Sequence, residues 1–123
     1  MPSSQKSTNE TCVIAVPVAR GRLCMHFGHC DQFALLDVDT AEKRLLDIRT
    51  IDPPAHEPGL LPRWLHEQGA NLVIAGGMGQ RAQDIFAEQG VNVIVGAPAE
   101  TPDSLVRSYL DGTLQPGENT CDH

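Results

Sequence analysis

The chain has 123 residues and a mass of 13.3 kDa, enough for one domain with one hydrophobic core. Nine basic and sixteen acidic residues give a net charge of −7, which counts against nucleic-acid binding, because that binding depends on Lys and Arg. The apolar runs fall far short of the roughly 20 residues that span a membrane, and the polar start lacks the apolar stretch of a signal peptide. Composition therefore predicts a cytoplasmic protein with no nucleic-acid or membrane partner.

Three strands are predicted in the first half of the chain. Residues 12–18 form a β-branched apolar run. Residues 33–39 and 44–51 follow as two strands joined by a short turn, which predicts an antiparallel hairpin. The segment 20–31 is predicted to be a loop, because glycines interrupt it and no period is sustained.

The second half alternates helices and strands. The predicted elements are a helix over 60–68, a strand over 71–75, a helix with an apolar stripe from Met78 to Gln89, a strand over 91–95, and a helix that Thr101 caps, with Pro102 first and Gly112 as its stop. The later β-α-β steps demand right-handed parallel crossovers. The sequence therefore predicts an α/β fold with a mixed five-stranded sheet flanked by helices. This single domain covers residues 12–112, with a disordered tail over 1–11 and a flexible tail over 113–123.

Soft metal ligands gather between Cys24 and Cys30. This stretch of seven residues also holds His26 and His29, although the whole chain has only four Cys and five His. Thiolate and imidazole suit zinc, copper, iron or an iron–sulfur cluster, and clustered cysteines in the cytosol more often indicate metal or redox chemistry than disulfides. The spacing matches no standard zinc module. The alternative is that the histidines form hydrogen bonds in a loop and the cysteines pack against the sheet.

A glycine-rich turn could supply the other wall of such a site. Gly76, Gly77, Met78 and Gly79 stand between a predicted strand and a helix. Glycines there allow close approach of the backbone, and the helix amino terminus offers N–H groups to a phosphate or an anionic cluster. Arg81 could add positive charge. The alternative is a tight structural turn without a ligand.

The chain ends in Cys121-Asp122-His123, a Cys-x-His pair on the expected tail. An arm with two soft ligands could close over a metal held by the loop. An incidental terminus is the equal alternative.

Catalytic constellations are few. Asp37 and Asp39 could suggest two-metal nuclease chemistry, but they alternate with apolar residues as on the solvent face of a strand. We therefore interpret both carboxylates as solvated.

Several motifs resemble the dinitrogenase iron–molybdenum cofactor biosynthesis family. They are His26-Phe27-Gly28, then Phe33 with the acidic strand end at 37–39, and the stretch from Asn71 to Ala82; the resemblance covers nearly all of residues 12–110. It implies a ribonuclease H-like topology and a protein that carries metalloclusters or their precursors without catalysis. It also implies a nucleotide-binding iron–sulfur carrier ATPase as a partner. Cys24, His29 and Cys30 are additional soft ligands that many members lack, and with the Cys/His tail they resemble a branch of small stand-alone proteins.

The sequence therefore predicts a protein that is not an enzyme and that binds, carries or scaffolds a metal cluster, either iron–sulfur or one containing iron and molybdenum. The predicted metal ligands are Cys24, His26, His29, Cys30, Cys121 and His123. The predicted cluster-binding residues of the turn are Gly76, Gly77, Met78, Gly79 and Arg81. A zinc-binding or thiol-redox regulatory module is the first alternative, and a ribonuclease H-like nuclease using Asp37 and Asp39 is the second.

Overall fold

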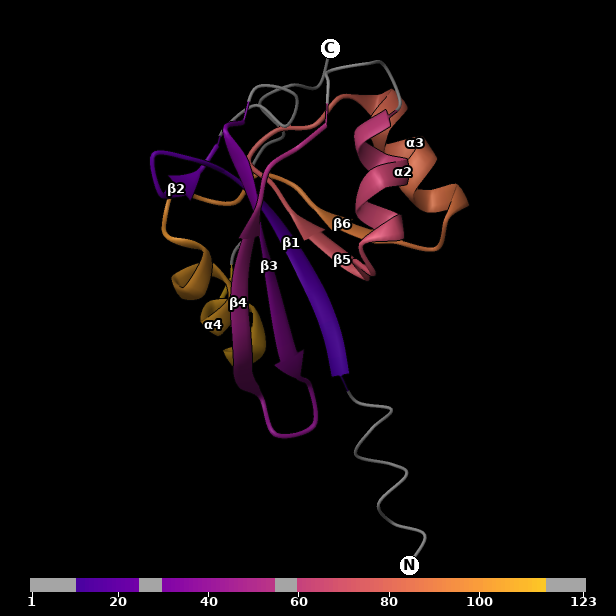
Figure 1. Cartoon of the computed structure of the whole chain (residues 1–123). Coiled ribbons are helices and arrows are strands. Elements are labelled where there is room, and N and C mark those ends of the chain that lie inside the picture. Colours follow the sequence, from indigo (N-terminus) through magenta and orange to yellow (C-terminus); the bar gives the residue numbers. More distant parts are fainter. Residues whose placement is uncertain (1–10, 25–29, 55–59, 115–123) are drawn as a thin grey trace, which may run out of the picture.

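The computed structural model describes residues 11–24, 30–54 and 60–114. Figure 1 shows the elements, which run in chain order. They are β1 (Thr11–Ala19), β2 (Arg22–Leu23), β3 (Gln32–Asp39), β4 (Arg44–Ile51), α2 (Leu60–Glu67), β5 (Leu72–Ile74), α3 (Gln80–Glu88), β6 (Asn92–Ile94) and α4 (Pro102–Asp111).

The sheet has the strand order β4-β3-β1-β5-β6, with β1 in the middle. Strand β1 is antiparallel to β3, and β3 is antiparallel to β4, whereas β5 is parallel to both β1 and β6. The predicted α/β class and the mixed sheet are therefore confirmed. The sheet has six strands and not five, because β2 pairs with the end of β1.

The short strand β2 corrects the prediction that residues 20–31 are all loop. Arg20 and Gly21 have φ values of 57° and 82°, and the register places Ala19 opposite Arg22. Two consecutive residues with positive φ form the kind of turn whose twist matches that of the flanking strands. A strand of two residues is too short for a periodic pattern, so the sequence gives no signal for it.

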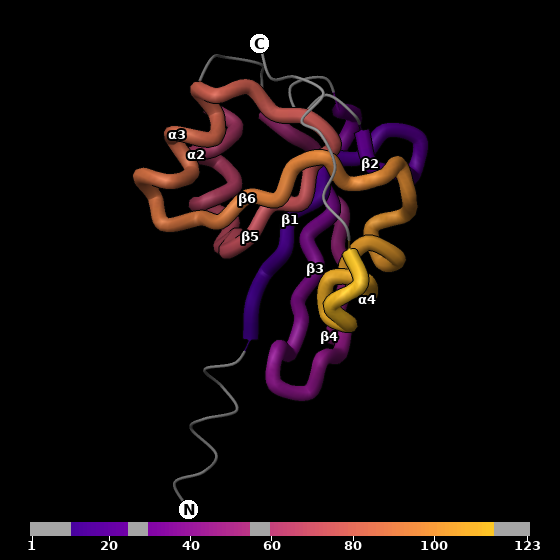
Figure 2. Tube along the Cα trace, turned by 180° about the vertical axis from the view of Figure 1, so that it is seen from behind, coloured from indigo at the N-terminus to yellow at the C-terminus, as the bar shows by residue number. Residues whose placement is uncertain are grey.

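Helices cover both faces of the sheet, with α2 and α3 on one side and α4 on the other (Figures 1 and 2). Alternate residues of β1 serve the two layers: Ile14 and Val16 pack in the core under α4, and Ala15 packs in the core under α2 and α3. All three are fully buried. A strand buried on both faces has a continuous apolar sequence, which is why β1 lacks polar alternation.

Three local predictions are corrected at helix ends. Thr101 precedes α4 in extended conformation, but its side chain makes no capping hydrogen bond. Met78 lies before α3 and not on its stripe, since the helix begins at Gln80. Thr113 and Leu114, assigned to the flexible tail, stay attached: the amide of each donates to the carbonyl of Ser108. At the amino-terminal end of the domain, Thr11, assigned to the disordered tail, belongs to β1.

Among the described helices, none combines the length and apolar character needed to cross a membrane.

The turn between β1 and β2 provides a test of local strain. Gly21 has a φ of 82° and open space where a Cβ would stand, so Gly21→Ala changes backbone strain and creates no clash. We expect it to lower the free energy of unfolding by about 1–2 kcal/mol. Gly79→Ala is the matched control, because Gly79 has equal space and an ordinary φ of −66°, and its effect should stay within about 0.5 kcal/mol. Urea denaturation of both variants measures the difference in the free energy of unfolding. Equal losses of stability in the two variants would show that the positive φ of Gly21 is not the cause.

Candidate functional site

The candidate site lies where the chain leaves the carboxyl ends of β1 and β5. These strands are parallel neighbours, and their following segments diverge, one to β2 and β3 and the other to α3 and β6. In open α/β sheets, ligands bind outside the carboxyl ends of strands where successive connections diverge. The segment after β1 contains Cys24 and Cys30, and the segment after β5 contains the turn from Gly76 to Gly79.

The β1–β2 hairpin holds Cys24 beside the end of β1. The amide of Cys24 donates to the carbonyl oxygen of Pro17 at 2.8 Å, and the amide of Leu23 donates to that of Glu100 at 2.9 Å. The Cys24 side chain is buried, with 9% exposed. The backbone at Leu23 and Cys24 is thus held by hydrogen bonds to two different segments of the chain.

Cys30 is anchored on the other side of the same strand end. The amide of Asp31 donates to the carbonyl oxygen of Val18 at 2.9 Å, so consecutive residues of β1 hold the two ends of the segment 24–31. The half-buried Cys30 packs against the core under α2 and α3, the same cluster that contains Met78 and Ala75. The structure therefore brings Cys30 to the side of the sheet from which the glycine turn begins.

Cys24 lies close enough to Cys30 to affect the pKa of the Cys30 thiol. Burial is the main cause, and together with the neighbouring Cys24 and Asp31 it raises the pKa of Cys30 to about 12, although a backbone hydrogen bond acts in the opposite direction. Cys30 is a free thiol, so the two are not joined in a disulfide. At neutral pH the Cys30 thiol is protonated, and a metal must displace this proton to bind.

The glycine turn is held tightly at its base and open at its helix end. Gly76, Gly77 and Met78 are buried, whereas Gly79 is exposed. The carbonyl oxygen of Gly76 accepts the amide of Gly96 at 2.8 Å, which extends the β5–β6 pairing into the turn.

Met78 and Arg81 play different parts in this turn. The Met78 side chain is fully buried in the core, and its carbonyl oxygen accepts the Gln83 side-chain amide at 2.9 Å. We therefore assign Met78 an anchoring role in the turn. Arg81 is exposed on the first turn of α3, where its charge stays available to an anion.

The other predicted ligands, His26, His29, Cys121 and His123, lie outside the described residues. Within ranges 11–24, 30–54 and 60–114, no three His, Cys, Asp or Glu side chains form a group that could hold a metal ion. The structure thus brings Cys24 and Cys30 to the strand end near the glycine turn. The other four predicted ligands stay predictions.

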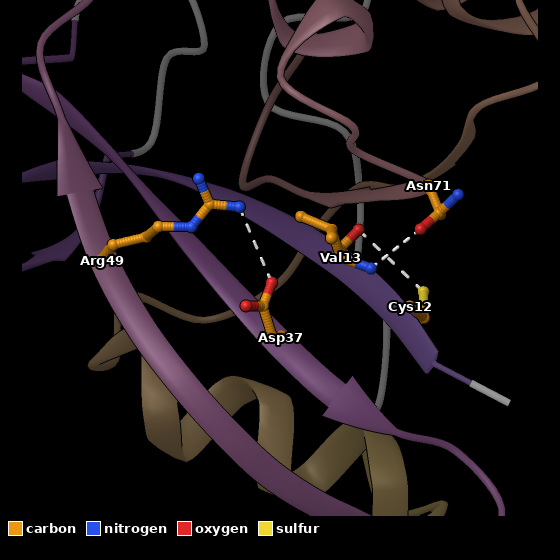
Figure 3. Close-up of polar contacts among 5 residues, drawn as sticks. All are labelled: Cys12, Val13, Asp37, Arg49 and Asn71. Carbon is orange, nitrogen blue, oxygen red and sulfur yellow. Dashed lines mark hydrogen bonds and ion pairs between the residues drawn. The ribbon is translucent and has the colours of Figure 1, made fainter. Parts of the chain in front are cut away.

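The carboxylates considered for nuclease chemistry have structural contacts. One Asp39 oxygen accepts the amides of Ala41 and Glu42, both at 3.0 Å, and shapes the turn after β3. Asp37 is not simply solvated, because its Oδ1 is buried and lies 3.7 Å from an Arg49 nitrogen (Figure 3). No observation on these two residues favours a nuclease.

Sequence reasoning missed the groups that position the thiols. They are the carbonyl oxygens of Pro17, Val18 and Glu100. Every residue has such a carbonyl, so no side-chain pattern marks them. The only available signal is Pro17, which stands near the end of the apolar run and has no N–H of its own.

Comparisons with known proteins agree with this architecture. The family model described as dinitrogenase iron-molybdenum cofactor matches residues 10–112. The chain is 28% identical over 105 residues to Uncharacterized protein MJ0580 of Methanocaldococcus jannaschii, covering 83% of this chain and 88% of that protein. The crystal structure of PH0822 superposes with a TM-score of 0.78 at 23% identity, covering 85% of this chain and 93% of that one. The apo form of the orange protein from Desulfovibrio gigas superposes with a TM-score of 0.68 at 22% identity, covering 87% and 93%.

The pKa of Cys30 predicts its reactivity in metal-free protein. Only the thiolate is alkylated readily, so the rate at Cys30 should keep rising with pH towards its pKa of about 12. An ordinary thiol, with a pKa of about 8.5, should reach its plateau near pH 10. Iodoacetamide labelling followed by peptide mass spectrometry measures each cysteine separately, and free cysteine in the same solution is the control. A plateau for Cys30 near pH 10, like that of an ordinary thiol, would contradict its raised pKa.

Proposed function

The chain belongs to the dinitrogenase iron–molybdenum cofactor family, and from that membership we propose that it binds a metal cluster or a cluster precursor and passes it to an acceptor protein. Membership and fold fit a role in cofactor biosynthesis or carrying. The observation that carries this proposal is that Cys24, and Asp31 next to Cys30, are anchored to consecutive residues of β1, while Cys30 packs against the core that contains Met78 of the glycine turn.

The two walls of the site offer complementary chemistry to an anionic cluster. Cys24 and Cys30 supply soft sulfur ligands to its metal ions, and the turn supplies backbone N–H groups at the start of α3 to its anionic atoms. The exposed Arg81 adds positive charge to the same wall. Binding at the thiols releases their protons, because only thiolate coordinates a metal.

The raised pKa of Cys30 suits a carrier better than a permanent metal centre. A thiol with a pKa of about 12 holds its proton strongly at neutral pH, so the proton competes with the metal and keeps the cargo exchangeable. Ligand exchange of this kind needs neither a nucleophile nor a general base. We therefore propose a carrier without catalysis.

We include His26, His29, Cys121 and His123 in the proposed ligand set because imidazole and thiolate match the cysteines in softness. A nucleotide-binding iron–sulfur carrier ATPase is the proposed partner, and the cytoplasm, where thiols stay reduced, is the proposed location.

Anaerobic reconstitution tests the carrier. Incubation with iron and sulfide, or with thiomolybdate and iron, should produce sulfur-to-metal charge-transfer absorbance in the visible range. The double variant Cys24→Ser with Cys30→Ser should lose at least about 90% of this absorbance, since a hydroxyl is a poor ligand for these soft metals.

Cys12→Ser is the matched control for that experiment. Cys12 is also a partly buried free thiol with a raised pKa, but it lies at the start of β1, away from the site. Its variant should retain the parent spectrum. If the double variant binds the cluster as tightly as the parent, the proposed site is wrong.

The neighbouring thiols also favour a second candidate, a zinc-binding or thiol-redox module. Two nearby cysteines can hold zinc or close a disulfide. Metal analysis of protein purified without oxygen distinguishes the two candidates: we expect iron or molybdenum, with zinc well below one equivalent. Stoichiometric zinc without iron or molybdenum would replace the carrier with the zinc module.

A further inference from the structure

Strand β4 forms an exposed edge of the sheet. It pairs with β3 on one side, and within the described ranges no other backbone hydrogen bond involves residues 44–51. An edge strand presents unpaired N–H and C=O groups that can pair with another chain. The opposite edge, β6, has only three residues, whereas β4 has eight. The long edge is therefore the one available for strand pairing.

Exposed apolar side chains gather on the same strand. Leu46 is 47% exposed and Ile48 is 45% exposed, the two highest values among the large apolar side chains of the described residues. Both lie on β4, close to its centre. A surface that pairs with another chain through this strand would cover them.

The charges of β4 are incompletely paired within the chain. The register places Asp47 directly opposite Asp37, so two like charges face each other. Arg49 extends from β4 to Asp37, with 3.7 Å between its Nη2 and the Asp37 Oδ1 (Figure 3). No cation of the described residues lies within ion-pair distance of Asp47. Asp47 thus presents an exposed negative charge that is available to a cation of another chain.

We propose that β4 pairs antiparallel with β4 of a second copy of this chain, with the two-fold axis at Ile48. This register sets Asp47 of each copy opposite Arg49 of the other and sets the two Ile48 residues face to face. Opposite charges directly across a strand pair stabilise it. A pairing centred on Asp47 or on Arg49 instead places like charges opposite each other, so the charge order selects the register.

The symmetry of the arrangement is consistent with backbone pairing. A residue on the two-fold axis faces itself with the same orientation in both chains, so the hydrogen-bond ladder forms whichever way the Ile48 amide points. A single strand pair buries less than the roughly 1,600 Å² of a standard interface. We therefore expect a weak dimer that forms with rising concentration. The pairing does not depend on the proposed metal site.

Sedimentation equilibrium of the full chain, under reducing conditions and at low salt, tests the dimer. The parent should shift from monomer to dimer across a concentration series. Asp47→Arg and Arg49→Asp each convert two attractive pairs to two repulsive ones, which should weaken association by about tenfold or more. The double variant with both substitutions exchanges the charges and should associate like the parent. It also keeps an in-chain ion pair, because an arginine at position 47 stands opposite Asp37.

Asp84→Arg controls for net charge. It makes the same change of charge as Asp47→Arg, but on α3, whose main contacts in the fold are with α2 and β6. This variant should dimerise like the parent. Circular dichroism and thermal unfolding establish that each variant is folded.

A cysteine cross-link tests the register independently. With Ile48→Cys, the two thiols face each other across the axis at a separation that a disulfide can bridge, so mild oxidation should give a covalent dimer. Thr50→Cys, also exposed on β4, moves the thiol away from the axis and should give far less. A parent that stays monomeric at every concentration, or single and double charge variants that associate equally, would overturn the proposal.

Discussion

The burial of β1 at the centre of the sheet is the constraint on which the rest of the structure depends. Its residues Ile14, Ala15 and Val16 are fully buried between the two helical layers, and it pairs with β3 on one side and β5 on the other. Each fully buried aliphatic side chain of this size contributes about 1–3 kcal/mol of transfer free energy. The position of β1 therefore determines where its carboxyl end emerges, and with it the place of the candidate site.

The candidate site is an extension of that strand. Backbone carbonyls of Pro17 and Val18, consecutive residues of β1, hold the chain at Cys24 and at Asp31. Both of these described residues are thereby tied to the central strand of the sheet. The same proximity to the core buries Cys30 and raises its pKa to about 12. The anchoring of this segment and the raised pKa of Cys30 thus have one structural cause, the position of the segment against the core.

Local sequence was enough to predict most elements and the mixed sheet, because apolar periodicity and glycine stops are local signals. The strand over 44–51 was predicted with its exact bounds, and the helix from Pro102 to Gly112 was correct apart from the cap at Thr101. The missed strand β2 has only two residues, and the turn before it requires a positive φ at Arg20. Positive φ is uncommon at residues other than glycine, so an arginine in the sequence does not indicate it. The contacts of Asp37 were missed for a related reason, since Arg49 belongs to another strand.

The sequence by itself determined which residues are able to bind a soft metal, because thiolate and imidazole carry that chemistry wherever they stand. It also determined the order of the strands and helices other than β2. Only the tertiary structure decided that Cys24 and Cys30 emerge beside one strand end, near the turn that follows β5. It alone placed β4 at an open edge with Asp47 facing Asp37. The physical reason is that burial depends on which strands become neighbours and charge pairing depends on the exact register between them, and local periodicity determines neither.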